Sequence, residues 1–100
     1  MEKRKPHYDL AAVKARVDAR GIDTFTRTAK DNARQMGLDE RAALGVVLGL
    51  QPAMLFKSMT THADARMWQD VYHAPCPNGK TAYIKVTIQD GATVIQFKEK

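Results

Sequence analysis

Residues 81–98 read TAYIKVTIQDGATVIQFK, the most regular pattern in the chain. Apolar, largely β-branched residues alternate with polar ones on both sides of Asp90-Gly91, a dipeptide that favours a two-residue type I′ hairpin loop. In such a loop Gln89 pairs with Ala92, and that pair sets every other pair of the two strands. The stretch therefore predicts an antiparallel hairpin of defined register.

The register assigns each side chain of the hairpin to one of two faces. One face pairs Ile84 with Phe97, Val86 with Ile95 and Ile88 with Thr93, and we expect it to be buried. The other face pairs Tyr83 with Lys98 and Lys85 with Gln96. Directly opposed side chains have Cβ atoms about 5 Å apart, so a phenol and an ammonium become neighbours. This pair is either chemically active or ordinary decoration of a solvent-facing surface.

Upstream of the hairpin, two further strands are predicted over residues 55–61 and 67–72. Three short helices are predicted before them: between Asp9 and Gly21, between Thr26 or Thr28 and Gly37, and between Asp39 and Pro52. The segment Ile22–Phe25 is expected to be a brief strand or an extended connection. Alternation divides Trp68, Asp70 and Tyr72 from Gln69 and Val71, but does not indicate which set is buried.

Helices followed by strands with short turns predict an α+β fold, an antiparallel sheet with helices packed on one face. One hundred residues are one domain's worth of chain. We expect a single domain over residues 1–100, with a helical half at about 1–54 and a sheet half at about 55–100.

The charge balance favours a polyanionic partner. Sixteen Lys and Arg against 11 Asp and Glu give a net charge of +5, which points first to nucleic acid, although a basic domain without such a partner has the same composition. Cys76 is the sole cysteine, so no internal disulfide is expected and a reducing cytoplasm is the natural location. No segment reads as a membrane span or a secretory signal.

No metal site or cofactor is predicted. His73 and Cys76 have an H-x-x-C spacing, but a zinc site needs three or four ligands. Cys76 also lies between Pro75 and Pro77, in a loop that offers no ordered base to a nucleophilic thiol.

Several blocks resemble one family at once. They are MEKR at 1–4, PH at 6–7, FKSMTT at 56–61, WQDVY at 68–72, YIKVT at 83–87 and FKEK at 97–100. In these blocks, in their order and in total length, the chain resembles the MqsR family, the motility quorum-sensing regulator toxins of bacterial type II toxin–antitoxin systems. Phe56 stands where relatives often carry Tyr, and the segment 74–80 is peculiar to this chain.

The resemblance implies a RelE-like fold and a function. Members of the family are mRNA interferases that cleave single-stranded mRNA independently of the ribosome, typically at GCU-type sites. They are inhibited by a MqsA-like antitoxin that binds DNA and carries zinc in its own toxin-binding domain, so DNA is reached only through the antitoxin. The family's catalytic residues correspond to Lys57, Gln69, Tyr83 and Lys98 in this sequence.

These residue types suit an RNase that works without a metal. Such an enzyme must deprotonate the 2′-hydroxyl, neutralise charge on the phosphoryl oxygens and protonate the leaving 5′-oxygen. Lys57 and Lys98 can stabilise the phosphorane or serve as base, and Gln69 can hydrogen-bond a phosphoryl oxygen or the 2′-hydroxyl. Tyr83 can orient the phosphate or transfer a proton, and which group is acid or base is left open.

RNA contacts are predicted at a second set of residues. Lys85 supplies backbone charge, while Phe56 and Tyr72 offer rings for stacking on an unpaired base, with His7 at the rim. Trp68 could also stack, although a lone Trp is more often in a core. The alternative function is a noncatalytic RNA- or ribosome-binding regulator; a DNA-binding repressor lacks support because no predicted helix is notably basic.

Overall fold

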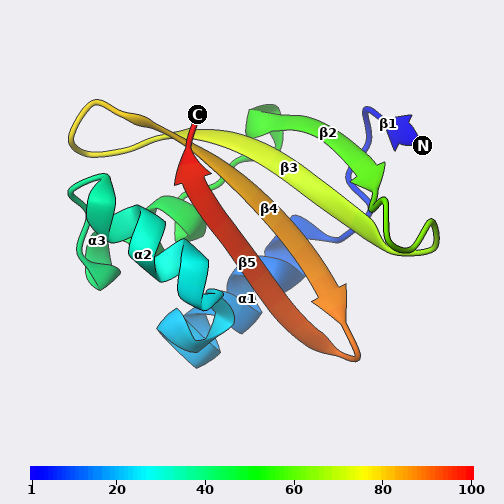
Figure 1. Ribbon diagram of the computed structural model, residues 1–100, viewed down its shortest axis with the longest axis horizontal. Coiled ribbons are helices and arrows are strands. Elements are labelled where there is room, and N and C mark those ends of the chain that lie inside the picture. Colours follow the sequence, from blue (N-terminus) through cyan, green and yellow to red (C-terminus); the bar gives the residue numbers. More distant parts are fainter.

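The computed structural model describes residues 1–100 as a five-stranded antiparallel sheet with three α-helices (Figure 1). The strands are β1 (Glu2–Lys3), β2 (Leu55–Thr60), β3 (Trp68–Pro75), β4 (Thr81–Gln89) and β5 (Ala92–Glu99), and they lie in sequence order across the sheet. The helices are α1 (Leu10–Arg20), α2 (Arg27–Gln35) and α3 (Glu40–Leu48). This confirms the α+β prediction, and it is compatible with a RelE-like fold.

The β4–β5 hairpin has the predicted register. Gln89 pairs with Ala92, and the ladder continues to the pair of Tyr83 with Lys98. Asp90 and Gly91 both have positive φ angles, 52° and 77°, as a type I′ loop requires. The side chains of the predicted inner face are buried, except Ile88, which is partly buried.

The helices begin at the predicted caps. The side chains of Asp9, Thr26 and Asp39 accept hydrogen bonds from the backbone N–H groups of Ala11, Ala29 and Ala42 at 3.1, 3.0 and 2.8 Å. One local prediction was wrong in part. Residues Gly21–Thr24 form a 3₁₀ turn instead of a brief strand or an extended connection, because Gly21 at φ 64° reverses the chain after α1. Only Phe25 is extended, and it forms an isolated β-bridge with Ile95.

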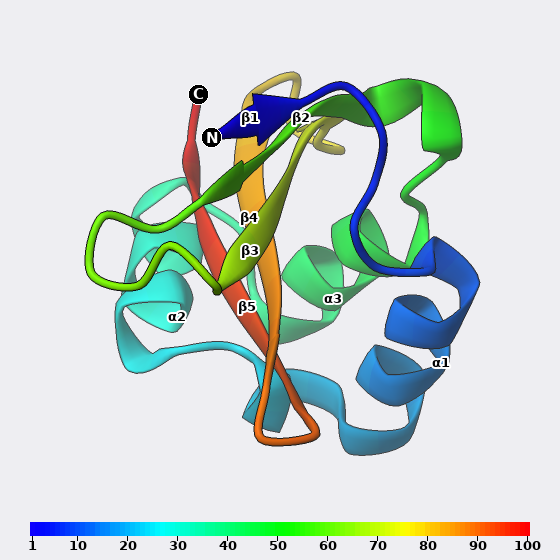
Figure 2. The ribbon, with the colours of Figure 1, turned by 90° about the vertical axis from the view of Figure 1, so that its right-hand side faces the viewer.

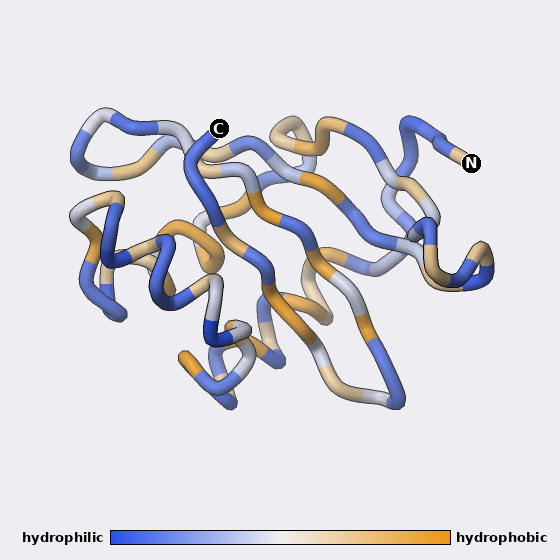
Figure 3. Tube along the Cα trace, viewed as in Figure 1, coloured by the Kyte–Doolittle hydropathy of each residue, from blue (hydrophilic) through white to orange (hydrophobic).

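The helices divide the sheet into a covered and an open face. In Figure 2, α1 and α3 lie on one side of the sheet, while α2 runs along its β5 edge. Val17 of α1 and Val47 of α3 are fully buried in a core shared with β3, β4 and β5. Figure 3 shows this apolar centre of the hairpin strands against hydrophilic chain ends.

Helix α2 and its cap residue donate hydrogen bonds to backbone carbonyls of the edge strand β5. The backbone N–H of Thr26 donates to the carbonyl of Ile95 at 3.0 Å, and the side-chain amide of Asn32 donates to the carbonyl of Phe97 at 3.0 Å. An edge strand with free carbonyls invites pairing with another chain, and these two bonds occupy that edge of β5. As a result, α2 is held beside the open face and borders it.

The N-terminal arm is fastened by a buried carboxylate. Asp70 is 1% exposed and accepts hydrogen bonds from the backbone N–H groups of His7 and Tyr8 and from the Ser58 hydroxyl, at 2.7–3.0 Å. The Tyr8 hydroxyl donates to the carbonyl of Trp68 at 2.8 Å. The beginning of the arm pairs with β2 as β1, a strand that the sequence did not predict.

Tyr72 lies within the core, 2% exposed. Burial, and after it the charge of Asp70, raises the pKa of this phenol to about 12 from an ordinary value of 10.0. Between these values the unfolded chain loses its proton while the folded chain keeps it, so stability falls as pH rises from 10 to 12. We expect Tyr72→Phe to lose less stability than the wild type over this range, as measured by urea unfolding at about pH 9 and about pH 11. Parallel losses in the two proteins would contradict the assignment.

No helix in the structure combines the length and the apolar character needed to traverse a membrane.

Candidate active site

Strand pairing places the four predicted catalytic residues on one face. We call this the open face, and its polar residues are Lys57, Gln69, His73, Tyr83, Lys85, Gln96 and Lys98. His73, Tyr83 and Lys98 form one cross-strand row, and Lys57, Val71, Lys85 and Gln96 form the next. Gln69 is two residues before Val71 on the same strand and therefore on the same face. Neighbouring strands are roughly 4.8 Å apart, so Tyr83 and Lys98 are direct neighbours, whereas the strands of Lys57 and Lys98 are separated by three such spacings. Gln69 lies two rows away from the row of Tyr83.

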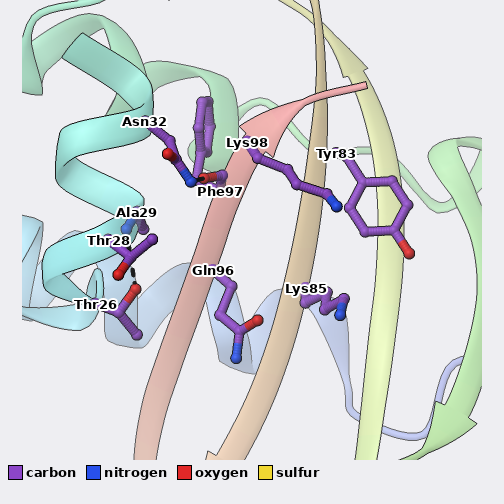
Figure 4. A pocket seen from close by; sticks show the side chains of 9 residues that line it. All are labelled: Thr26, Thr28, Ala29, Asn32, Tyr83, Lys85, Gln96, Phe97 and Lys98. Atoms are coloured by element: carbon purple, nitrogen blue, oxygen red, sulfur yellow. Dashed lines mark hydrogen bonds between the residues drawn. The ribbon is translucent and has the colours of Figure 1, made fainter. Parts of the chain in front are cut away.

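Tyr83 lies between two lysines on the open face, and we call Tyr83, Lys85 and Lys98 together the Tyr83 centre. The Lys98 ammonium lies 5.0 Å and the Lys85 ammonium 6.0 Å from the centroid of its ring (Figure 4). The predicted proximity of Tyr83 and Lys98 is therefore confirmed. The phenol is partly exposed, and its hydroxyl makes no hydrogen bond within the chain. A phenol flanked by two ammonium groups suits an anionic ligand such as a phosphodiester.

A second cluster joins this centre through stacked rings. The Phe56 ring lies on the His73 ring with centroids 4.4 Å apart, and His73 lies 5.5 Å from Tyr83. A bulge between Leu55 and Lys57 displaces Phe56 from the regular ladder, and the side chain is 41% exposed. The ammonium of Lys57 lies 5.5 Å from the Phe56 ring. Three rings from three strands thus connect Lys57 to the Tyr83 centre.

His73 lies on the candidate site, although the sequence did not predict it there. From the sequence it was only a metal or thiol candidate together with Cys76, because the strand predicted over residues 67–72 ended at Tyr72. Burial, followed by the charge of Lys100, lowers the pKa of its imidazole, which favours the neutral ring at neutral pH. Within the chain the ring nitrogens make no hydrogen bond. The signal that would have found it is the β3–β4 register, in which His73 opposes Tyr83.

Lys57 is held by a partner that the sequence did not predict. Its ammonium contacts the Glu2 carboxylate of β1 at 2.6 Å, and this hydrogen bond and charge lower the pKa of Glu2. The pair turns Lys57 toward the β1 edge of the sheet. An incoming phosphate must therefore compete with Glu2 for this ammonium.

We expect Glu2→Gln to bind single-stranded RNA a few-fold more tightly than the wild type at low salt, with the gain shrinking as salt rises. The gain arises because the competing carboxylate is gone. The measurement is a titration with an RNA oligomer whose 2′-hydroxyls are methylated to prevent cleavage. Glu40→Gln makes the same charge change on α3, away from the open face. Equal gains in both variants would show that only net charge matters.

Polar groups on the open face are otherwise unpaired. The side chains of Gln69, Lys85, Gln96 and Lys98 make no hydrogen bond or salt bridge within the chain, whereas Lys14, Lys57 and Lys80 do. Free donors and acceptors on one surface are available to a ligand without breaking internal contacts. A cavity of about 390 Å³ lies beside them, lined by Thr26, Thr28, Ala29, Asn32, Tyr83, Lys85, Gln96, Phe97 and Lys98 (Figure 4).

Two predicted RNA-binding residues lie elsewhere. Tyr72 pairs with Ile84 and points into the core, so the prediction that it stacks on RNA was wrong: alternation alone did not reveal which face is buried. His7 is exposed but stacks on Trp68 at 5.1 Å, beside Asp70 on the helix-covered side of β3, and so does not join the Tyr83 centre. Trp68 is partly buried beneath His7 and the Lys3 ammonium. No cluster of three or more His, Cys, Asp or Glu side chains is arranged to hold a metal ion.

Two comparisons with known proteins give the same family, and each covers all or nearly all of the chain. The model of a family described as motility quorum-sensing regulator, toxin of MqsA, matches residues 5–99. The mRNA interferase toxin MqsR of Escherichia coli (strain K12) is 42% identical over 100 residues, an alignment that covers 100% of each chain.

Proposed function

The chain belongs to the MqsR toxin family, and from this membership we propose that it is an mRNA interferase, an endoribonuclease toxin that cuts single-stranded mRNA without the ribosome. The observation that carries the proposal is the grouping of Tyr83 with Lys85 and Lys98, and through the stacked rings with Lys57, on the open face. The alternative, an RNA- or ribosome-binding regulator that performs no cleavage, would use the same basic surface.

The proposed reaction is attack of the substrate's own 2′-hydroxyl on the adjacent phosphorus. A new bond forms between the 2′-oxygen and phosphorus, and the bond from phosphorus to the 5′-oxygen breaks. The 2′-hydroxyl loses one proton, and the leaving 5′-oxygen gains one. The products are a 2′,3′-cyclic phosphate and a 5′-hydroxyl. In this reaction the protein must stabilise charge on the phosphoryl oxygens and move one proton.

Each residue of the open face has a proposed role. Lys98 and Lys57 neutralise the developing charge on the phosphoryl oxygens, because a positive charge placed where negative charge develops stabilises the transition state. Tyr83, between Lys98 and Lys85, orients the phosphate or transfers the proton. Gln69 hydrogen-bonds a phosphoryl oxygen or the 2′-hydroxyl. With three ammonium groups available, we propose that no metal ion is required.

Residues next to the proposed catalytic groups bind the RNA. Lys85 adds positive charge that attracts the RNA, and the exposed Phe56 ring, already stacked on His73, offers its outer surface to an unpaired base. We propose a preference for GCU-type sites on the basis of the family likeness.

The biological setting is also a proposal. We propose that the chain is one domain over residues 1–100, that it acts in the cytoplasm, and that a MqsA-like antitoxin neutralises it. That antitoxin would bind DNA and carry its own zinc, so the toxin itself would need neither.

One cleavage assay separates the two candidate functions. Two end-labelled single-stranded RNAs of equal length, one with a single GCU and one without, are incubated with the purified protein in EDTA. We expect cutting at the GCU, with cyclic-phosphate and 5′-hydroxyl ends. RNA that is bound but stays intact would instead support the noncatalytic regulator.

A further inference from the structure

The cavity beside the Tyr83 centre has walls of two origins. Tyr83, Lys85, Gln96 and Lys98 belong to the hairpin, while the opposite wall is the first turns of α2 (Figure 4). Its volume of about 390 Å³ is near the lower end for ligand pockets, which matches one nucleotide rather than several. It opens next to the residues that would hold the scissile phosphate. An RNA strand whose scissile phosphate is held by these residues must therefore place the adjoining nucleotide at or in this cavity.

The hairpin wall supplies groups for a nucleotide's anionic and aromatic parts. The ammonium groups of Lys85 and Lys98 are free of salt bridges and lie 6.0 and 5.0 Å from the centroid of the Tyr83 ring. Lys98 is in the row of Tyr83, whereas Lys85 is in the next row, directly opposite Gln96. Lys98 is thus suited to the phosphate, and Lys85 with Gln96 to the adjoining base.

The remaining groups can read a base edge. The Thr28 hydroxyl and the Gln96 carboxamide are exposed and make no hydrogen bond within the chain. Asn32 is different: its Nδ2 donates to the carbonyl of Phe97 at 3.0 Å, which fixes the amide and leaves Oδ1 as an unpartnered acceptor. Thr26 is occupied as the helix cap, so it contributes shape rather than recognition.

We infer that this cavity is a base-recognition subsite for one unpaired nucleotide adjacent to the cleaved phosphodiester. Gln96, Thr28 and Asn32 bind the base edge, Lys85 donates to a base carbonyl, and Tyr83 forms the aromatic wall. Single-stranded RNA is commonly recognised in this way, by a base beside an aromatic ring with hydrogen bonds at its edge. The inference rests on the proposed function and adds that α2, in the helical half, helps to select the cleavage sequence.

The donor and acceptor pattern narrows the base. Asn32 supplies an acceptor that suits an N–H of the base, and the Lys85 ammonium supplies a donor that suits a carbonyl oxygen. Guanine, uracil and cytosine each carry both groups, whereas adenine has no carbonyl. We therefore expect one position flanking the cut to disfavour adenine.

The test maps cleavage ends on an RNA pool randomised on both sides of the cut, using the wild type, Gln96→Ala, Thr28→Val and the double variant. Both residues are exposed, so the substitutions should leave the fold intact, which thermal unfolding checks. Gln89→Ala is the matched control, since Gln89 is an exposed glutamine at the far end of β4 and outside the cavity.

We expect the variants to lose about 2- to 10-fold of the discrimination at one flanking position only, the size of one or two hydrogen bonds. Gln89→Ala should keep both rate and preference. Variants that cut more slowly but keep every base preference would overturn the inference and leave the proposed function standing. A wild-type protein that cuts none of the pool would overturn both.

Discussion

Lys98→Ala is expected to lower kcat/KM for RNA cleavage by about 100- to 1,000-fold without unfolding the protein. The Lys98 side chain is exposed and bonded to nothing else in the chain, so its loss leaves no internal group unpaired. It is also the ammonium nearest to the Tyr83 ring, at 5.0 Å, where charge would develop on the phosphate. The readout is initial cleavage rate at subsaturating RNA.

Lys30→Ala serves as the control for Lys98→Ala, because it removes the same charge from α2 outside the cavity and should change the rate less than about twofold. A Lys98→Ala protein that cuts as fast as this control would remove Lys98 from the mechanism. The same logic extends to Lys57→Ala, Gln69→Ala and Tyr83→Ala, each of which is expected to abolish toxicity in cells while the protein stays folded.

Asp70→Ala is expected to lower the free energy of unfolding by about 3 kcal/mol, because hydrogen bonds to a buried charge are strong and their donors become unpaired. The substitution removes the common acceptor of His7, Tyr8 and Ser58 and so releases the N-terminal arm from the sheet. For a domain with about 5–15 kcal/mol of stability this is a large fraction.

Urea unfolding measures the effect of Asp70→Ala. The comparison is Asp31→Ala, which removes a carboxylate whose only partner is Arg34 in an exposed pair on α2, and which should cost less than about 1 kcal/mol. If the two variants unfolded at similar urea concentrations, the Asp70 network would not be what holds the arm.

The parts of the fold that the sequence predicted are those encoded locally. Asp90-Gly91 specifies its loop without reference to the rest of the chain, and this alone placed Tyr83 opposite Lys98. The caps at Asp9 and Asp39 are equally local, since each side chain bonds an N–H two or three residues on. Alternation then set the buried face of the hairpin.

The features that the sequence did not predict depend on contacts between distant segments. β1 is two residues long and exists because β2, more than 50 residues away, pairs with it. Alternation did not indicate whether Asp70 is buried, because its burial depends on the N-terminal arm that folds over it. The register of β3 against β4 is set across a Pro-containing loop, so the position of His73 opposite Tyr83 was not available from spacing.

The proposed catalytic residues illustrate the same division. Tyr83 and Lys98 were predicted as neighbours from the hairpin register, whereas Lys57 and Gln69 were assigned through family resemblance and lie on the open face because β2 and β3 continue the sheet. The wall that α2 contributes to the cavity has no sequence signature, since it depends on how that helix meets the β5 edge.

The most direct test of the mechanism removes one oxygen atom from the substrate. An RNA with a single cleavage site is compared with the same oligomer carrying a 2′-deoxy sugar at the nucleotide whose 2′-hydroxyl would attack, both in EDTA. We predict that the all-RNA oligomer is cut to a cyclic phosphate and that the substituted oligomer stays whole at that position. Cleavage of the deoxy-substituted bond at a comparable rate would contradict attack by the 2′-hydroxyl, and with it the chemistry assigned to the open face.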